Sequence, residues 1–313
     1  LKKSARSMAS RREHTARYQE RYLHPHIYQP TGRELTGTEC ILSISDTHAT
    51  FLDPFVWHSF LRACVVLEPD YIVLNGDILE GSDISRHPKI PGWSCDLQLE
   101  FDFAREMMKQ LRVVAPDAEI IWTAGNHGLD RLAAYLSQVA PALACLDNLR
   151  FDKLAGVEEY GIQLAQGGSI ASPKGTENDM PGLLIHDYLI HHGHLLGQCP
   201  SLAELKKALR SGESGHAHRS SLSFMTYEGL CLSWMTTPMG CVPRAGRAYM
   251  KGRDFGWQGG FGLTFLHPGG RVHQTPVICD QGVCIFEGFV IESPGFKEMP
   301  VQANWLKDFK VPR

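Results

Sequence analysis

The chain alternates short apolar runs with stretches of helical periodicity between residues 40 and 139. Three runs predict buried strands, at Cys40–Ser45, Tyr71–Asn75 and Glu119–Ala124. Longer stretches with apolar residues at helical spacing predict helices, at Pro54–Leu67, Asp96–Val114 and Asp130–Val139. Because strands and helices alternate, this half predicts a largely parallel sheet covered by helices.

After about residue 160 the apolar runs become more frequent, and glycine and proline separate them. They predict strands at Gly161–Ala165, Leu183–Ile190, Ser221–Tyr227, Leu230–Met235, Gly262–Leu266 and Val283–Ile291. In this half, Leu202–Leu209 is the clear helical segment. Since no linker or repeat separates the two halves, we expect one continuous α/β unit.

Residues 1–39 differ in charge from the rest of the chain. They hold eight Lys and Arg against four Glu, although the whole chain has a formal charge of −3. A solvated arm is one interpretation, and a basic arm that grips nucleic acid is the other. We therefore divide the chain into a basic arm (1–39) and one domain (40–313), with the motifs in 40–219, a β-rich part in 220–295 and a tail in 296–313.

Bulk composition excludes several classes of protein. A hydrophobic fraction of 43% with 21% charged residues is that of a globular protein rather than a disordered one. No apolar stretch reaches the ~18 residues that cross a bilayer, so no membrane association is expected. Nine scattered cysteines without C-x-x-C spacing predict reduced thiols in an intracellular protein. The 15 histidines raise the question of metal or acid–base chemistry.

Polar side chains follow each of the three predicted strands of the first half. Asp46 and His48 follow the first strand, Asp77 follows the second, and Asn126 and His127 follow the third. Ligands of open α/β sheets bind outside the carboxyl ends of the strands. We therefore expect these side chains to meet at one edge of the sheet.

Two histidine clusters later in the chain add further metal-ligating groups. The first holds His191, His192 and His194, and the second holds His216 and His218. Residues i and i+2 of an extended backbone point to the same side, so such pairs can converge on one ion. Carboxylate oxygen with imidazole nitrogen suits Mn, Fe, Zn or Ni better than Ca or Mg alone. The ordered set indicates a two-metal site.

The motifs DTH, NGD, GNH, HHG and GHAH, in this order, resemble those of the calcineurin-like metallophosphoesterase superfamily, over about residues 40–219. The resemblance implies a four-layer α/β/β/α sandwich with a dinuclear metal centre at the strand ends. It also implies a set of ligands: Asp46, His48 and His218 for one ion, Asn126, His192 and His216 for the other, and Asp77 as the bridge. His127 would contact the phosphate and protonate the leaving oxygen.

The activity that this resemblance implies is attack on a phosphoester by a metal-activated hydroxide. Two divalent ions are implied, with Mn as first choice and Fe, Zn or Ni as alternatives. The chain looks most like bacterial and phage-encoded members, which implies a cytoplasmic phosphodiesterase or nuclease-like enzyme with nucleic acid among its expected substrates. A generic phosphomonoesterase and a catalytically silent interaction scaffold are the alternatives. The sequence leaves the oligomeric state open.

The motifs depart from the family pattern at one position and are ambiguous at another. Gly128 stands where the family usually has Asp or Glu after the histidine of GNH, and Asp130 is the nearest carboxylate that could orient His127. In the fourth motif His194 competes with His192 as the ligand, and the preceding apolar strand favours His192.

Two residues outside the proposed metal ligands can be interpreted either as substrate-binding residues or as ordinary surface or packing residues. Arg86 follows the Asp77 loop and is predicted to bind substrate phosphate, the alternative being a surface arginine. Trp257 belongs to an aromatic, Gly-rich stretch. We expect it to pack in a β-turn, and a stacking platform for a nucleobase is the alternative.

Overall fold

The computed structural model describes residues 34–86, 96–165, 182–243, 256–293 and 305–312. The predicted basic arm therefore lies almost entirely outside the described residues.

The larger of two sheets is mixed and contains eight strands. Its order is β13 (Phe289–Glu292), β12 (Val283–Phe286), β11 (Arg271–Asp280), β10 (Gly260–His267), β1 (Glu39–Ile44), β2 (Tyr71–Asn75), β3 (Glu119–Thr123) and β4 (Ile162–Ala165). The pairs from β1 to β4 are parallel, as the alternation of strands and helices predicts. The pairs from β1 through β10 to β13 are antiparallel and extend the sheet from its parallel half.

The smaller sheet contains five strands. Its order is β5 (Leu183–Ile185), β6 (Tyr188–His191), β7 (Gly212–Ser214), β9 (Leu230–Thr236) and β8 (Ser221–Tyr227). The short strand β7 lies at its centre and pairs in parallel with both neighbours.

Two segments that were each predicted to be a single strand form a hairpin of two strands instead. Leu183–Ile190 divides into β5 and β6 at a turn where His186 has a φ of 50°. Val283–Ile291 divides into β12 and β13 where Glu287 and Gly288 have φ values of 45° and 81°. Two-residue hairpin turns need such positive φ values. The apolar pattern continues on both sides of each turn, so it resembles one long strand.

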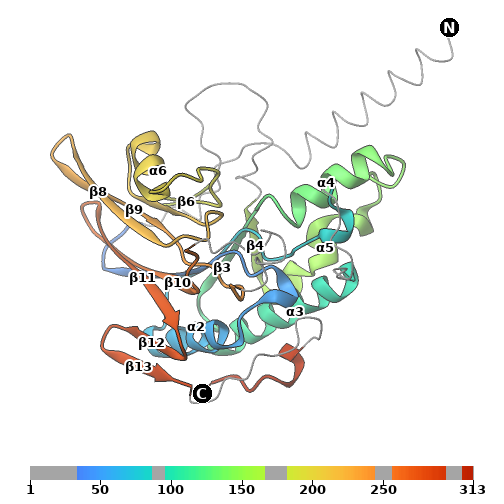
Figure 1. Ribbon diagram of the computed structural model, residues 1–313, viewed down its shortest axis with the longest axis horizontal. Helices are drawn as coiled ribbons and strands as arrows, with labels where there is room; N and C mark the ends of the chain where they lie inside the picture. Colours follow the sequence, from blue (N-terminus) through green and yellow to red (C-terminus); the bar gives the residue numbers. More distant parts are fainter. Residues whose placement is uncertain (1–33, 87–95, 166–181, 244–255, 294–304, 313) are drawn as a thin grey trace, which may run out of the picture.

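Helices cover the outer faces of the two sheets, which face each other (Figure 1). The α-helices are α2 (Pro54–Leu67), α3 (Leu97–Val114), α4 (Leu129–Gln138), α5 (Phe151–Ala155) and α6 (Pro200–Ala208). The 3-10 helices are η1 (Ala49–Phe51), η2 (Ser82–Ile84), η3 (Asp147–Leu149), η4 (Val157–Tyr160) and η5 (Trp305–Asp308). With α2 on the larger sheet and α6 on the smaller one, the chain forms the expected four-layer α/β/β/α sandwich.

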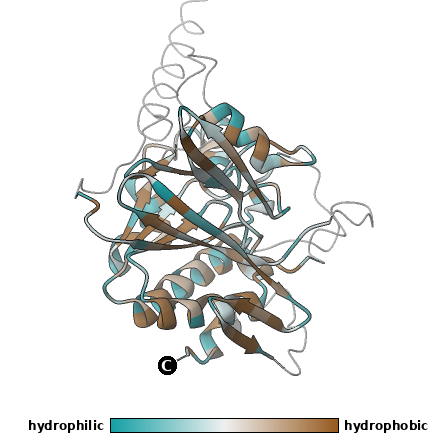
Figure 2. Cartoon of the chain, turned by 90° about the vertical axis from the view of Figure 1, so that its left-hand side faces the viewer, coloured by the Kyte–Doolittle hydropathy of each residue, from teal (hydrophilic) through white to brown (hydrophobic). Residues whose placement is uncertain are grey.

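The three largest clusters of the hydrophobic core lie between the four layers. The largest lies between the helices and the larger sheet and includes Trp57 of α2. A second lies between the sheets and includes Val73 and Tyr188. A third, which includes Trp234, lies under α6. Figure 2 shows hydrophobic residues concentrated in the strands of both sheets.

Two bulk properties of the sequence are visible in this fold. The eight cysteines in the described part of the chain are all free thiols. None of the helices described here combines the length and apolar composition needed to cross a bilayer.

A buried polar network crosses the space between the two sheets. Glu213 of β7 is fully buried and accepts a hydrogen bond of 3.0 Å from the hydroxyl of Tyr188. The side-chain amide of Gln274 in turn donates to that hydroxyl at 2.6 Å. Burial raises the pKa of Glu213 to about 7, against the hydrogen bonds from neighbouring hydroxyls. The folded protein therefore binds a proton at Glu213 more tightly than the unfolded chain does.

Replacement of Glu213 with glutamine should change how stability depends on pH. The contribution of Glu213 to wild-type stability is complete below the unfolded pKa near 4.5 and is lost as pH rises through about 7. Glutamine keeps an acceptor for Tyr188 but cannot ionise. We expect E213Q to match wild type at pH 4 and to exceed it by up to about 3 kcal/mol at pH 8. Urea unfolding of chelator-treated protein measures this, and equal differences at both pH values would contradict it.

Candidate metal centre

The carboxyl ends of β1, β2 and β3 meet the loops after β6 and β7 at one edge of the sandwich. Each strand is followed within a few residues by polar side chains. The structure brings the seven predicted ligands together there: Asp46, His48, Asp77, Asn126, His192, His216 and His218.

One group of donor atoms belongs to Asp46, His48 and His218, and these atoms all lie within 4.8 Å of one another. The Nε2 atom of His218 is 3.0 Å from Oδ1 of Asp46. The other carboxylate oxygen of Asp46 accepts a hydrogen bond of 2.9 Å from the backbone N–H of His216. That bond fixes the loop after β7 against the loop after β1.

A second group belongs to Asp77, His192 and His216, again with donor atoms within 4.8 Å of one another. Nε2 of His192 is 3.0 Å from Oδ2 of Asp77 and 3.2 Å from Oδ1 of Asn126. Nδ1 of His192 donates to the backbone carbonyl of Asn75 at 3.0 Å, which leaves Nε2 directed at the carboxylates. The amide of Asn126 thereby joins this second group.

The structure brings His192, and not His194, to the centre. The side chain of His194 faces away, and its Nε2 atom is 2.9 Å from Nζ of Lys207. His191 lies behind the centre, where its Nε2 atom is 3.6 Å from Oε2 of Glu204. The two flanking histidines therefore contact α6.

Buried charge makes the centre suitable for divalent cations. Burial opposes ionisation of Asp77, but His127 and His192 hold its pKa well below the usual range. Burial also works against the charged form of His192, but Asp77 and Asp46 raise its pKa to about 9. Without metal, the protonated imidazole of His192 thus offsets part of the buried negative charge. Cations can replace that proton, so the donor set fits two divalent ions.

The backbone of this centre is held in an unusual conformation. Five of the seven predicted ligands have positive φ values. They are Asp46 (54°), His48 (49°), Asp77 (50°), His216 (64°) and His218 (56°). Non-glycine residues rarely adopt this left-handed region, and such residues cluster at functional sites.

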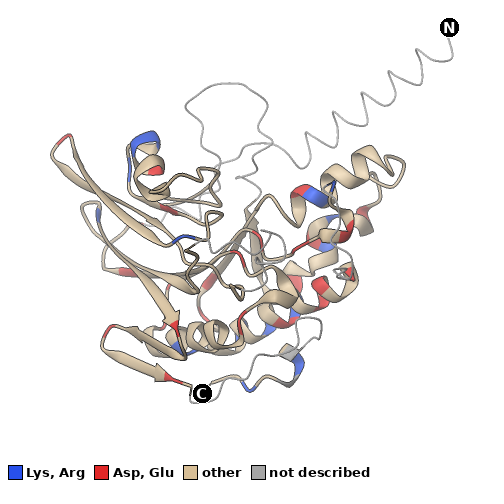
Figure 3. Cartoon of the chain, viewed as in Figure 1, with Lys and Arg blue, Asp and Glu red and all other residues tan. Residues whose placement is uncertain are grey.

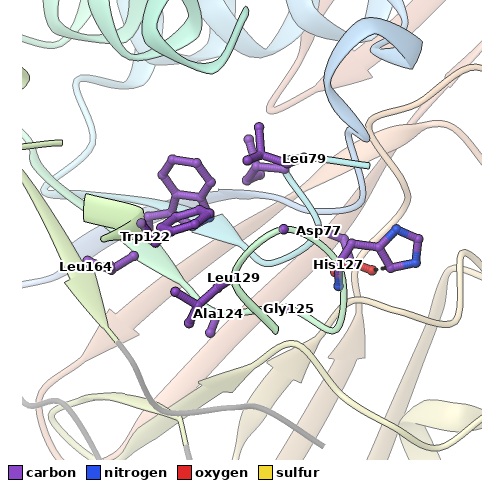
Figure 4. Close-up of a pocket in the computed structure, with 11 residues that line it drawn as sticks. Asp77, Leu79, Trp122, Ala124, Gly125, His127, Leu129 and Leu164 are labelled. Carbon is purple, nitrogen blue, oxygen red and sulfur yellow. Dashed lines mark hydrogen bonds and ion pairs between the residues drawn. The ribbon is translucent and has the colours of Figure 1, made fainter. Parts of the chain in front are cut away.

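The turn that carries Asn126 and His127 approaches Asp77 so closely that Gly125 has to lack a side chain. A Cβ atom there would overlap the carboxylate and the backbone nitrogen of Asp77. A small pocket adjoins the turn, and apolar side chains including Trp122 and Leu129 line it (Figure 4). Figure 4 shows the His127 ring turned away from these apolar walls.

His127 has defined partners at its backbone and at both ring nitrogens. Its backbone N–H donates to Oδ1 of Asp77 at 2.7 Å. Nδ1 is 3.0 Å from Oε2 of Glu80, and Nε2 is 2.8 Å from the NH2 nitrogen of Arg131. The ring also lies near the centre, with Nε2 3.8 Å from Oδ2 of Asp77. The geometry allows His127 to reach a phosphate bound there.

Glu80 and Arg131 are site residues that the sequence interpretation missed. Oε2 of Glu80 is also 2.8 Å from Nδ1 of His48, and Oε1 is 3.2 Å from Arg131. Burial works against its charge, but hydrogen bonds with His127 and His48 hold the pKa of Glu80 below its usual range. A signal was present, because Glu80 comes three residues after Asp77 in the same loop.

The orienting carboxylate beside His127 in the structure is Glu80. Asp130 lies in the first turn of α4, and its predicted role stays a prediction. Gly128 precedes that helix with φ 54° and ψ −102°. This conformation favours glycine, which accounts for the missing Asp or Glu after the GNH motif.

The remaining two residues considered from the sequence, Arg86 and Trp257, have different surroundings. Arg86 is exposed on the loop after η2. Trp257 lies beside the centre, with its ring 4.6 Å from that of His218 in an edge-to-face arrangement. Its other contacts include the buried Phe51 and Met239, so the expected packing role and a place at the site coexist.

Comparison with known proteins gives one family match. The family model for calcineurin-like phosphoesterases matches residues 41–222. No curated protein matches the chain.

Several solved structures share part of this architecture. A dimetal phosphatase from Danio rerio is 12% identical with a TM-score of 0.37, over 83% of this chain and 99% of that one. Vacuolar protein sorting 29 from Cryptosporidium parvum is 12% identical with a TM-score of 0.33, over 82% and 96%. A purple acid phosphatase from yellow lupin is 10% identical with a TM-score of 0.32, over 75% and 52%. Likenesses this distant add nothing to the family match.

Proposed function

Because this chain belongs to the calcineurin-like phosphoesterase family and is a metal-dependent phosphoesterase, we propose that it cleaves phosphodiesters, with nucleotide or nucleic-acid diesters as the substrate class. The observation that carries this proposal is the pair of side chains beside the partly exposed part of the centre, Trp257 and Arg131. They offer contacts on both sides of a bound phosphate.

Four of the described residues of the centre are partly exposed to solvent: Asn126, His127, His216 and His218. The side chains of His127 and His218 are 17% and 16% exposed, whereas those of Asp46 and His192 are 0% exposed. A substrate phosphate therefore reaches the centre at this partly exposed part. The buried carboxylates and His192 form the floor of the site.

Two different side chains flank this opening. Trp257 lies beside His218, and Arg131 lies beside His127. The rings of His218 and His127 are linked through His48, at centroid distances of 5.5 and 4.7 Å. A phosphodiester has a substituent on each side of its phosphorus, whereas a monoester has one. A rim with contacts on both sides therefore favours the diester.

Within the described residues, recognition of a nucleic-acid substrate would rest on local contacts. Figure 3 shows Lys and Arg scattered over separate elements of the described chain, with Asp and Glu between them. A continuous basic surface would have indicated phosphate-backbone binding. An aromatic ring such as that of Trp257 instead favours stacking on one base next to the scissile phosphate.

The side chains of the centre have distinct roles in this proposal. Asp46, His48 and His218 would hold one ion, and Asn126, His192 and His216 would hold the other, with Asp77 as the expected bridge. Bound divalent ions supply positive charge to the phosphate oxygens and activate water as the nucleophile. His127, oriented through its Nδ1 atom by Glu80, donates a proton to the leaving oxygen.

We propose manganese as the metal. The ligand set combines carboxylate and amide oxygens with imidazole nitrogens, which suits Mn and also Fe, Zn and Ni. Reconstitution of chelator-treated protein with each ion, followed by activity and metal analysis, tests this choice. Higher turnover with another ion at equal occupancy would contradict it.

A substrate series tests the diester proposal. Mn-loaded protein should cleave bis(p-nitrophenyl) phosphate with a kcat/KM at least about tenfold above that for p-nitrophenyl phosphate. Single- and double-stranded DNA extend the series. Turnover of the monoester alone would contradict the diester proposal and leave a phosphomonoesterase.

Replacement of Trp257 tests whether this residue binds a substituent of the diester. We expect W257A to raise KM for the bis-ester by about tenfold, since stacking of one aromatic group contributes 1–3 kcal/mol. The variant F224A is the matched control, because Phe224 is an exposed aromatic residue on β8 (62% exposed). Equal KM values for W257A, F224A and wild type would assign Trp257 to packing alone.

A further inference from the structure

Arg131 occupies the nitrogen of His127 that faces the opening of the centre. It lies in the first turn of α4, which begins two residues after His127. Its NH2 nitrogen is 2.8 Å from Nε2 of His127. Its NH1 nitrogen donates to the backbone carbonyl of Glu80 and to Oε1 of the same residue.

These contacts determine which nitrogen of His127 carries the proton. A guanidinium group only donates hydrogen bonds and stays charged, so Nε2 has to be the acceptor. Nδ1 then carries the hydrogen and donates to Glu80, from which it is 3.0 Å away. While Arg131 stays in place, Nε2 can neither contact a phosphate nor hold a proton for a leaving oxygen.

We propose that Arg131 binds the phosphate of the substrate, moving its NH2 group from Nε2 of His127 to an unesterified phosphate oxygen while its NH1 group stays on Glu80. This proposal rests on the proposed function of the same site and names the residue that recognises the phosphate. It also replaces Arg86, the substrate-binding arginine predicted from the sequence.

The exchange of partners is favourable on chemical grounds. A hydrogen bond from the guanidinium to a phosphate oxygen joins two opposite charges, whereas the imidazole nitrogen is a neutral acceptor. The contacts with Glu80 and His127 use three of the five N–H donors of Arg131. The remaining donors and the planar shape of the group suit two oxygens of one phosphate.

The position of Arg131 in the site also favours this role. Its side chain is 17% exposed, as is that of His127, so both reach the opening. Nε2 of His127 is in turn 3.8 Å from Oδ2 of Asp77, a member of the second group of donors. Arg86, by contrast, is exposed on the loop after η2. Arg131 contacts His127, and His127 lies near Asp77. A phosphate bound at the centre is therefore close to Arg131.

Inorganic phosphate is the probe for this inference. Its dissociation constant is measured by calorimetry on Mn-loaded wild type, R131A, R131K and R86A, with metal content determined for each sample. Loss of one charged hydrogen-bond donor should weaken phosphate binding by about 10- to 100-fold in R131A. R131K keeps the charge but loses the planar fork, and should weaken it by about fivefold or more. R86A tests the competing arginine and should bind phosphate as wild type does; weaker binding in R86A instead of R131A overturns the proposal.

The outcomes separate this inference from the proposed function. Phosphate binding by R131A and R131K within twofold of wild type, at equal metal content, overturns the role of Arg131. If R131A does not fold, weaker phosphate binding by R131K is sufficient to support the role of Arg131. Calorimetry needs no turnover, so a wild-type protein that binds phosphate through Arg131 but cleaves no diester overturns the diester proposal and leaves the inference standing.

Discussion

Replacement of Asp77 with asparagine is expected to reduce bound Mn from two ions to fewer than one per chain and to lower turnover by about 1,000-fold or more. Asp77 is a buried member of the second group of donors, with a carboxylate oxygen 3.0 Å from Nε2 of His192. Its pKa is held well below the usual range by His127 and His192 against the effect of burial, so it is charged at any working pH. Asparagine keeps the shape but removes that charge.

The matched control is Asp70, at the opposite end of the same strand. Asp70 immediately precedes β2 and accepts a hydrogen bond from the backbone N–H of Cys40, whereas Asp77 follows the strand. D70N should keep two ions and near-wild-type turnover. Metal analysis after Mn reconstitution, with circular dichroism as the check on folding, measures both variants. A D77N protein that keeps two ions would show that Asp77 does not bridge them.

The position of Asp77 was predictable because buried parallel strands have a simple sequence pattern. Tyr71–Asn75 is apolar on both faces, and the structure places β2 over the same residues. Once such strands are recognised, their carboxyl ends are the places where ligands bind. The same argument placed Asp46 and Asn126. The positions of these residues could be predicted without knowing how distant segments of the chain pack.

Glu80 and Arg131 could not be placed in that way, because their roles depend on how two loops pack. The sequence interpretation selected Asp130, one residue before Arg131, to orient His127. A shift of one residue on a helix rotates the side chain by about 100°. The loop after β2 packs against the start of α4, so Glu80 contacts His127 and Arg131. Contacts between loops that are 51 residues apart leave no local pattern.

The strand β7 escaped prediction for a different reason. It consists of Gly212, Glu213 and Ser214, which have no apolar periodicity, yet all three are buried. Glu213 is tolerated there because Tyr188 donates a hydrogen bond to it from the neighbouring strand β6. A buried polar strand can be recognised only when its partners are known.

Replacement of His127 with asparagine is expected to lower turnover by about 100- to 10,000-fold and to leave metal content unchanged. The backbone N–H of residue 127, and not its side chain, donates to Asp77 at 2.7 Å, so this bond survives the substitution. The ring itself contacts Glu80 and Arg131, which are not among the predicted ligands. H127N therefore removes the proton donor and keeps the centre.

The identity of the leaving group makes this test specific for proton donation. A p-nitrophenolate leaves without much help from an acid, whereas an alkoxide needs a proton. H127N should therefore lose less activity toward bis(p-nitrophenyl) phosphate than toward an alkyl diester such as a dinucleotide. H186N is the control, because His186 also pairs with a glutamate, Glu39, at 2.9 Å but lies outside the donor groups of the centre. If metal content falls in parallel with activity in H127N, His127 stabilises the centre and is not the acid.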